Sequence, residues 1–353
     1  MSGPRRLPRA LFWSLGGGVA LVSLAVALRI LVPAAGGRAE TVGDGRDPGS
    51  YGFDLSPCLV PSETLVSSGL PRDGLAALDR PLLLDLAGVD SLTAAMRGKY
   101  LVSTDRVVGM VINGCARAWP LRVLNWHEVV NDTLGGRAVA VTWSPLTGSV
   151  RAFARDVDGA VLQFGVSGLL TDGNLLMYAR SDTLSLWSQL AGRAVTGPAA
   201  AQERTLLDLP LVVCDWAAWR ARHPETTVPL PAKEYRKRYG SDPYFSYRHG
   251  HVVRYPVSIP TLEDALAPLL FVRDASGVVL IDTAAVAELV GEGAAWQLER
   301  PDGTLSFHTG TTLGVGAPAL WLDDSESRND MRVWPVYRYA ARTFQMGIEE
   351  VRP

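Results

Sequence analysis

The densest group of side chains that could carry out chemistry lies in NWHEVVND, residues 125–132. On a helix, His127 and Asn131 would share one face because they are four residues apart. Glu128 and Asp132 have the same spacing. A histidine and two carboxylates on one turn can bind a divalent metal ion, or act as a general base and its orienting partner. The structural interpretation is a satisfied, half-buried histidine beside Trp126 and ordinary helix-end residues at Asn131 and Asp132. We favour it, because a single cluster lacks the convergent groups that a functional site needs.

A second stretch, VTWSPLTGSV at residues 141–150, ends a strand-like run in a short polar turn. Ser144 and Thr147 are three residues apart around Pro145, a spacing at which two cysteines would form a redox or metal-binding pair. Their hydroxyl groups stay protonated near neutral pH, so they cannot replace thiolate ligands or form a disulfide. A catalytic serine needs a base within reach, and nothing in the sequence places His127 near Ser144. We therefore predict a structural turn.

Short strands and tight turns surround these two stretches. Strand-like runs at 106–112 and 115–121 flank an Asn-Gly pair, a strong signal for a two-residue hairpin turn. In RVLNWHEVVNDTLGG, residues 122–136, the spacing of the apolar residues predicts a short helix that ends at the two glycines. A strand is expected to follow at 137–144.

The later chain has the same kind of pattern. A second hairpin is expected from 149–156 and 160–167, and a third around Pro-Asp-Gly at 301–303. The order hairpin, helix, strands in the last third resembles residues 106–155 and suggests a weak internal repeat. The patterns predict a β-rich α+β fold, with a mixed or antiparallel β domain and a few short helices. Further elements are expected at 174–179 and 185–195 (strands), 215–226 (helix), 269–274 and 278–283 (strands), and 283–290 (helix).

The N-terminus carries a targeting signal. Arg5, Arg6 and Arg9 precede a stretch, residues 10–28, that has no charged side chain. At ~1.5 Å per residue, a helix of that length approaches the ~30 Å hydrocarbon thickness of a bilayer. Arginines before the span predict that the N-terminus is cytoplasmic and the main domain lies outside. The predicted boundaries are a cytoplasmic segment at 1–9, a transmembrane signal-anchor at 10–33 and a flexible tether at 34–50.

A cleaved signal peptide is the competing interpretation, although its apolar region would be longer than the usual ~7–15 residues. Under either interpretation, the domain is exported. If the segment is an uncleaved anchor, the protein is a single-pass protein of the cell membrane and its anchor contacts the lipid bilayer. The chain has 34 Lys and Arg against 36 Asp and Glu, so no nucleic-acid partner is expected. Cys58, Cys115 and Cys214 have no C-x-x-C spacing. Two of them could pair in an exported domain, or all three could be small buried hydrophobes.

Several motifs, in order, resemble the DUF3179 family, a bacterial and archaeal domain of unknown function. They are ARAWPLRVLNWHEVVNDTLGGRAVAVTWSPLTGSVRAF, FGVSGLL, MYARSDTLSLWSQLAGRAVTGP and WAAWRARHPETTV, and the resemblance extends over residues 52–260. It implies a DUF3179-like domain at 51–260. The remainder, 261–353, is then a β-rich C-terminal extension that resembles the family only loosely.

The resemblance also implies what this chain lacks. Family members typically have cysteines where this chain has Ser144 and Thr147, and an acid at Ala179. The segment from Trp126 to Asp132 and the run Ser185–Gln189 agree with the family pattern. The family has no settled activity, so the resemblance implies an architecture and no reaction.

Three functions are compatible with the sequence. We favour a membrane-anchored extracytoplasmic module that binds a small ligand or a membrane or extracytoplasmic protein partner without catalysis. The alternative is a metal-binding protein or metal-dependent enzyme centred on His127, Glu128 and Asp132, with a divalent metal on His127 and Asp132. A purely structural copy that assembles with other membrane proteins is the third. The candidate site comprises His127, Glu128, Asn131, Asp132, Ser144, Thr147 and Arg180.

Overall fold

The computed structural model describes residues 41–96, 100–250, 252–259, 264–310, 320–322, 331–346 and 350–351. The expected signal-anchor at 10–33, and the cytoplasmic segment before it, lie outside these residues. Among the described residues, no helix combines the length and the apolar character that a membrane crossing requires. These residues form a β-rich α+β fold with short helices, which confirms the predicted fold class.

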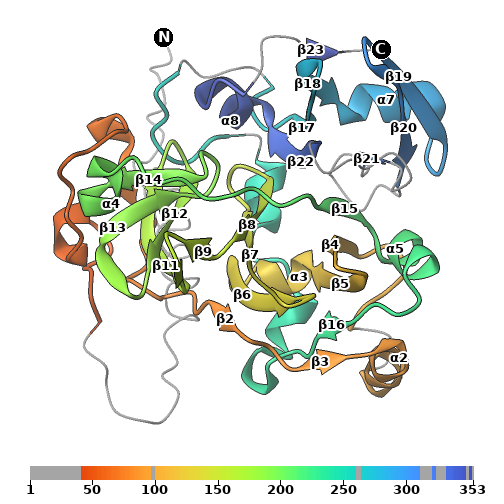
Figure 1. Ribbon diagram of the computed structural model, residues 1–353, viewed down its shortest axis with the longest axis horizontal. Coiled ribbons are helices and arrows are strands. Elements are labelled where there is room, and N and C mark those ends of the chain that lie inside the picture. The colour runs from red at the N-terminus through yellow and green to blue at the C-terminus, as the bar shows by residue number, and fades with distance from the viewer. Residues whose placement is uncertain are drawn as a thin grey trace, which may run out of the picture.

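An antiparallel sheet forms one side of the molecule, at the left of Figure 1. Its strands lie in the order β1-β11-β12-β13-β14, and the short helix α4 (Gly197–Ala201) follows its last strand. The strand bounds are β1 Val66–Ser67, β11 Phe164–Thr171, β12 Asn174–Ala179, β13 Asp182–Ser188 and β14 Arg193–Thr196.

The central sheet has the order β2-β6-β7-β8, and β2 runs parallel to β6. Both faces of this sheet are buried. Ala140 of β7 packs toward β11 and β12, whereas its neighbours Val139 and Val141 pack toward β4 and β5. Burial on both faces explains the nearly continuous apolar run in β7. The bounds are β2 Leu78–Asp79, β6 Val129–Leu134, β7 Arg137–Ser144 and β8 Ser149–Ala154.

A third sheet, β15-β4-β5, covers the other face of the central sheet. Its β4–β5 hairpin turns at Asn113 and Gly114, which both have positive φ, so the predicted two-residue turn is confirmed. Helices α2 and α5 pack on its outer side. The bounds are β4 Arg106–Ile112, β5 Cys115–Pro120, β15 Val212–Asp215, α2 Leu86–Ala95, α3 Leu121–Leu124 and α5 Trp216–Arg222.

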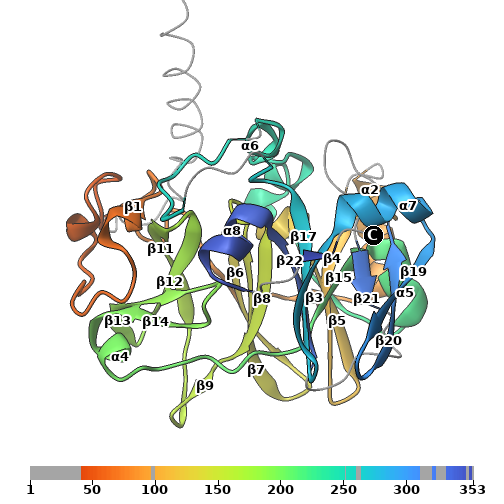
Figure 2. The same ribbon diagram turned by 90° about the horizontal axis from the view of Figure 1, so that it is seen from above.

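The C-terminal part contains two more sheets, β22-β17-β18-β23 and β19-β20-β21. Figure 2 shows them beside the central sheet and at the right edge of the molecule. The hairpin predicted around residues 301–303 is confirmed, and the strands expected at 269–274 and 278–283 pair with each other as β17 and β18. The bounds are β17 Pro268–Asp274, β18 Gly277–Asp282, α7 Thr283–Val290, β19 Ala295–Arg300, β20 Gly303–Thr309, β21 Leu320–Leu322, β22 Arg332–Tyr337, α8 Arg338–Thr343 and β23 Glu350–Val351.

The two halves share an order of elements. In the first, the hairpin β4–β5 leads through α3 to β6–β7–β8, and β15 then pairs with β4 and is followed by α5. In the second, β17–β18 leads through α7 to β19–β20–β21, and β22 pairs with β17 and is followed by α8. In each half, a buried apolar layer lies between the two sheets. Residues 156–201 interrupt the first half only. Whether this order reflects duplication of the chain stays a prediction.

The helix predicted over residues 122–136 is wrong. Only Leu121–Leu124 is helical, and Val129–Leu134 is strand β6, paired with β7. Gly135 and Gly136 both have positive φ, so they form the turn of a hairpin and do not end a helix. The β-branched residues of the segment favour this outcome.

The second predicted hairpin is also partly wrong. Residues 149–154 pair with β7, and Phe164–Thr171 pairs with β12 in the neighbouring sheet. Between them lies only the short hairpin of β9 and β10. The side chain of Arg155 bonds the carbonyl oxygens of Val139 and Leu162 where the chain passes between the sheets. The remaining short elements are β3 Leu83–Leu84, β9 Asp156–Val157, β10 Ala160–Val161, β16 Val228–Pro229, α6 Phe245–His249 and the 3-10 turns Pro48–Tyr51, Ser62–Thr64, Lys233–Tyr235 and Arg238–Gly240.

Candidate functional site

The segment NWHE, residues 125–128, lies in a sharp corner between α3 and β6, which we call the NWHE corner. Glu128 has φ 56°, a left-handed conformation that is unusual for a residue with a side chain. A later part of the chain lies over this corner: residues 231–250 and 252–259, here called the cover segment. Four consecutive side chains of the corner bond to it: Asn125 to Asp242, Trp126 to the Ser241 carbonyl, His127 to Tyr239 and Glu128 to Tyr244.

His127 is almost completely buried, with 1% of its surface exposed. Its Nδ1 lies 2.6 Å from the carbonyl oxygen of Ala76, and its Nε2 lies 2.6 Å from the Tyr239 hydroxyl. A carbonyl oxygen can only accept, so Nδ1 carries the proton and Nε2 accepts from the tyrosine. Burial lowers the pKa of His127 to about 4, against the opposing effect of the bond to Ala76. The imidazole is therefore neutral near pH 7, and both of its nitrogens are in use.

Glu128 is buried beside His127 but faces a different partner. Its Oε1 accepts a 2.7 Å hydrogen bond from the Tyr244 hydroxyl. Burial raises the pKa of Glu128 to about 7, although the bond from Tyr244 acts in the opposite direction. Burial and the neighbouring Glu128 raise the pKa of Tyr244 well above its ordinary value. A hydrogen bond from a buried tyrosine to a buried carboxyl group thus joins the cover segment to the corner.

Asn131 of β6 forms hydrogen bonds to β2 and to β11. Its amide nitrogen donates to the Phe164 carbonyl at 2.7 Å and to Asp79 Oδ1 at 2.8 Å, while its Oδ1 accepts from the Phe164 backbone N–H at 2.9 Å. Asp79 is also the ion-pair partner of Arg180, at 2.5 Å. Two of the predicted site residues, Asn131 and Arg180, therefore meet at the carboxylate of Asp79.

Asp132, the next residue of β6, has partners on β5. Its carboxylate accepts from Arg117 at 2.7 Å and from the Trp119 indole N–H at 3.1 Å. Successive side chains of a strand point to opposite faces, so Asn131 and Asp132 reach different sheets. With β6 in place of a helix, the spacing of four residues that suggested a shared metal site has no structural counterpart.

The turn after β7 contains the second predicted pair. The Ser144 hydroxyl accepts from the Leu175 backbone N–H at 3.3 Å. The Thr147 hydroxyl lies 2.7 Å from the Ser149 hydroxyl and accepts from the Asn174 amide at 3.2 Å. Both side chains are buried, at 2% and 0% exposed. The contacts are those of a structural turn, which is what the sequence predicted.

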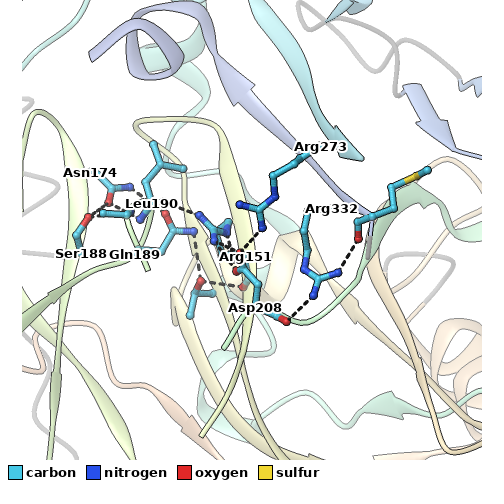
Figure 3. Close-up of polar contacts among 11 residues, drawn as sticks. Arg151, Asn174, Ser188, Gln189, Leu190, Asp208, Arg273 and Arg332 are labelled. Atoms are coloured by element: carbon cyan, nitrogen blue, oxygen red, sulfur yellow. Dashed lines mark hydrogen bonds and ion pairs between the residues drawn. The ribbon is translucent and has the colours of Figure 1, made fainter. Parts of the chain in front are cut away.

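Through Asn174, the Thr147 hydroxyl joins a buried polar network, and Figure 3 shows Asn174, Ser188 and Gln189 of this network. Gln189 accepts from Ser149 and Asn174 through Oε1 and donates to Thr142 through Nε2. Because each amide has partners for both its oxygen and its nitrogen, the network avoids the cost of unsatisfied buried groups. The run Ser185–Gln189 thus has a structural role at its Gln189 end.

Three tyrosines from the C-terminal half close over this turn. The Leu146 carbonyl accepts hydrogen bonds from Tyr247 at 2.8 Å and from Tyr339 at 3.1 Å. Tyr337 lies against Gly148, where a Cβ atom would come within 2.9 Å of its ring. The region in which the family resemblance implied thiols is therefore packed beneath aromatic side chains.

One buried polar cluster was not predicted from the sequence. Arg151 of β8, only 6% exposed, forms a two-pronged ion pair with Asp208. It also donates to the Leu190 carbonyl at 2.5 Å and stacks on Trp334, 4.1 Å from the ring centre. Arg273 and Arg332 reach the same aspartate, as Figure 3 shows. The sequence signal for this cluster was the arginine inside the apolar strand SVRAFA, because a buried arginine requires a buried partner.

The structure does not bring the seven predicted residues into one site. They lie in three places: the NWHE corner, the two faces of β6 with Arg180, and the turn after β7. Within the residues that the structure describes, there is no group of three His, Cys, Asp or Glu side chains placed to hold a metal ion. The three cysteines, all among the described residues, form no disulfide with one another. Cys58 and Cys115 are exposed, and Cys214 is buried.

A family model matches residues 72–289, which contain the NWHE corner, the polar network and most of the cover segment's contacts. The chain belongs to the DUF3179 family. The description of that family is a protein of unknown function. No curated protein and no solved structure matches the chain. The DUF3179 match ends inside α7, although β17 within it pairs with β22 beyond it.

Proposed function

We propose that this DUF3179 protein is a membrane-anchored extracytoplasmic module that binds a ligand or a partner protein and does not catalyse a reaction. The observation that carries the proposal is the bonding of His127. A general base or metal ligand needs a ring nitrogen directed at the substrate or metal. Both nitrogens of this histidine instead join the corner to Ala76 and Tyr239.

The turn after β7 supports the same conclusion. Ser144 and Thr147 carry hydroxyls where the family resemblance implied thiols, and both hydroxyls are engaged inside the protein. No contact joins Ser144 to His127, so the turn has no base that could activate a serine. A turn whose hydroxyls are all engaged inside the protein is consistent with a binding role.

The metal-dependent alternative draws less support from the contacts. His127 faces the cover segment, Glu128 bonds Tyr244, and Asp132 is paired with Arg117. We expect the full chain, purified in detergent, to contain far less than one equivalent of any transition metal by mass spectrometry, and His127→Ala to leave that value unchanged. Near-stoichiometric metal that disappears in the variant would overturn the non-catalytic proposal in favour of the metal site.

The anchored topology can be tested with the protein's own thiols. Cys58 and Cys115 are exposed while Cys214 is buried, so a membrane-impermeant maleimide reports where the surface of the domain lies. We expect labelling in intact cells, and loss of labelling in the Cys58→Ser/Cys115→Ser variant. Labelling that begins only after the membrane is permeabilised would place the domain in the cytoplasm and refute the topology.

Binding itself can be tested by photo-crosslinking in membranes. Leu82 is the most exposed large apolar residue of the described part of the chain, at 74%, and a partner surface is expected to include such a side chain. A crosslinking amino acid at Leu82 should give a discrete adduct. The same amino acid at the exposed Val161, on the separate β9–β10 hairpin, serves as the control. Equal, diffuse adducts at both positions would argue against a specific partner at Leu82.

A further inference from the structure

We propose that the outer surface of the cover segment docks onto the anionic surface of the bilayer that carries the N-terminal anchor. The inference rests on the proposed anchoring, and it adds a defined orientation of the domain against the membrane. Three observations carry it: the charge of the segment, its exposed apolar side chains, and the place where the described chain begins.

The cover segment is basic within a chain that is not. Between residues 233 and 254 there are six Lys and Arg against two Asp and Glu, whereas the whole chain has a net charge of −2. Four of the basic side chains, Lys233, Arg236, Lys237 and Arg254, are exposed. A cluster of cations near a membrane is attracted by the negative potential of anionic headgroups.

Large apolar side chains are exposed within the same basic region. Phe245 at the start of α6 is 57% exposed, and Val252 is 64% exposed. Such side chains, flanked by cations with long aliphatic stems, fit the headgroup boundary of a bilayer, where the apolar part enters the lipid and the charges stay in water. Neither property alone would distinguish this surface from an ordinary solvated face.

The described chain begins next to this surface. The carbonyl of Val42 accepts a hydrogen bond from the Arg72 backbone N–H. Nearby, Tyr255 of the cover segment donates to the Ser68 carbonyl at 3.1 Å. A Cβ atom at Gly45 would lie 3.1 Å from the Gly69 carbonyl oxygen, so the first described residues and the loop at Ser68 are neighbours. A chain that leaves the bilayer before residue 41 therefore enters the domain beside the cover segment.

The inner side of the cover segment is already fixed. The four bonds from the NWHE corner and the tyrosine contacts to Leu146 hold it in place. Docking would then require little ordering of the protein, which lowers its entropic cost. Figure 2 shows α6 at one end of the molecule and the β9–β10 hairpin at the opposite end. A residue on that hairpin can therefore serve as a control position far from the proposed membrane contact.

The test uses the full chain reconstituted into phosphatidylcholine vesicles, with or without about 30% phosphatidylglycerol. An environment-sensitive fluorophore is attached at Phe245→Cys, or at Val161→Cys as the matched control, in a Cys58→Ser/Cys115→Ser background. Val161 is an apolar residue of similar exposure, 56%. A lipid that carries a quencher in its headgroup region reports contact with the membrane.

We expect quenching and a blue shift at position 245 in anionic vesicles and neither at position 161. High salt should weaken the effect, because exposed charges are screened. The variant Lys233→Glu/Arg236→Glu/Lys237→Glu should lower the quenched fraction at least about fivefold. Equal quenching at positions 245 and 161 in vesicle-bound protein would overturn the docking proposal. Quenching at position 245 that does not change with lipid charge or salt concentration would overturn it as well. Protein that fails to float with the vesicles would instead refute the anchor.

Discussion

His127 and Glu128 are adjacent in the chain, and burial shifts their pKa values in opposite directions. The pKa of His127 falls from 6.5 to about 4, so the unfolded state binds more protons than the folded state in that window. Stability from His127 is therefore lost as the pH falls from 6.5 toward 4. The pKa of Glu128 rises from 4.5 to about 7, so its contribution is lost as the pH rises through that range. Between pH 4.5 and 6.5 the two effects nearly cancel.

Single substitutions should reveal this compensation. We expect the difference in free energy of unfolding, variant minus wild type, to fall by about 1.4 kcal/mol per pH unit between pH 4.5 and 6.5 in His127→Gln. In Glu128→Gln it should rise by a similar amount per unit. Urea unfolding at several pH values measures both slopes, and the subtraction removes groups common to both proteins. Parallel profiles for the two variants would show that the pair does not titrate as described.

The ion pair of Arg151 with Asp208 makes a second prediction at the level of residues. Asp208→Asn should lower the free energy of unfolding by about 3–5 kcal/mol, because it leaves the buried Arg151 without its counter-charge. Asp158→Asn is the matched control, since Asp158 is 65% exposed in its pair with Arg204 and such pairs contribute at most about 1 kcal/mol. Thermal unfolding compares the two. Equal losses would mean that the buried charge is compensated elsewhere.

At the level of elements, the β7–β8 turn is where the two halves of the chain meet. Gly148 and Gly159 both have positive φ, 62° and 80°, but only Gly148 has the Tyr337 ring within reach of an added Cβ. Alanine at Gly159 should cost about 1 kcal/mol from backbone strain alone. Alanine at Gly148 should cost about 1–3 kcal/mol more, because it also overpacks the tyrosine. Chemical denaturation measures the loss in free energy of unfolding of each variant. Equal losses would show that the Tyr337 ring moves aside at no cost.

Local patterns predicted the β4–β5 and β19–β20 hairpins because turn chemistry is local. Asn113-Gly114 and the turn at 301–303 behave as expected, and the helix at 283–290 matches α7. The Gly135-Gly136 pair was ambiguous, since two glycines suit a helix end as well as a hairpin. Pairing of β6 with β7, a tertiary effect, decided between them.

The candidate site was harder to predict than the fold. The sequence singled out NWHE by its density of polar side chains, but their partners Tyr239, Tyr244 and Asp242 lie more than 110 residues away in the sequence. No local pattern indicates such contacts. The turn at Ser144 and Thr147 was predicted because hydroxyl chemistry can be judged from residue type alone. Its polar partners again come from distant strands.

Taken as a whole molecule, the chain beyond the DUF3179 match is part of the same folded unit. Strand β22 pairs with β17, and Trp334, Val336 and Tyr339 complete a core with Leu269 and Phe271.

We therefore expect a chain that ends after Val290 to lose cooperative unfolding, because this core would be exposed. Removing only the last two residues is the control. Circular dichroism melting and binding of a hydrophobic dye distinguish the outcomes, and a cooperative melt of the shortened protein would show that the first half folds independently.

The contacts between the NWHE corner and the cover segment span 112–117 residues of sequence. A ribosome adds about 5–20 residues per second, so roughly 6–25 seconds pass after the corner is synthesised before its covering tyrosines exist. During that interval the apolar surface around His127 and the unpaired Glu128 carboxyl are open to solvent and to chaperones. The corner is therefore completed late in synthesis. Slow translation anywhere between residues 129 and 244 would lengthen its exposure to misfolding, whereas a delay before residue 125 would not.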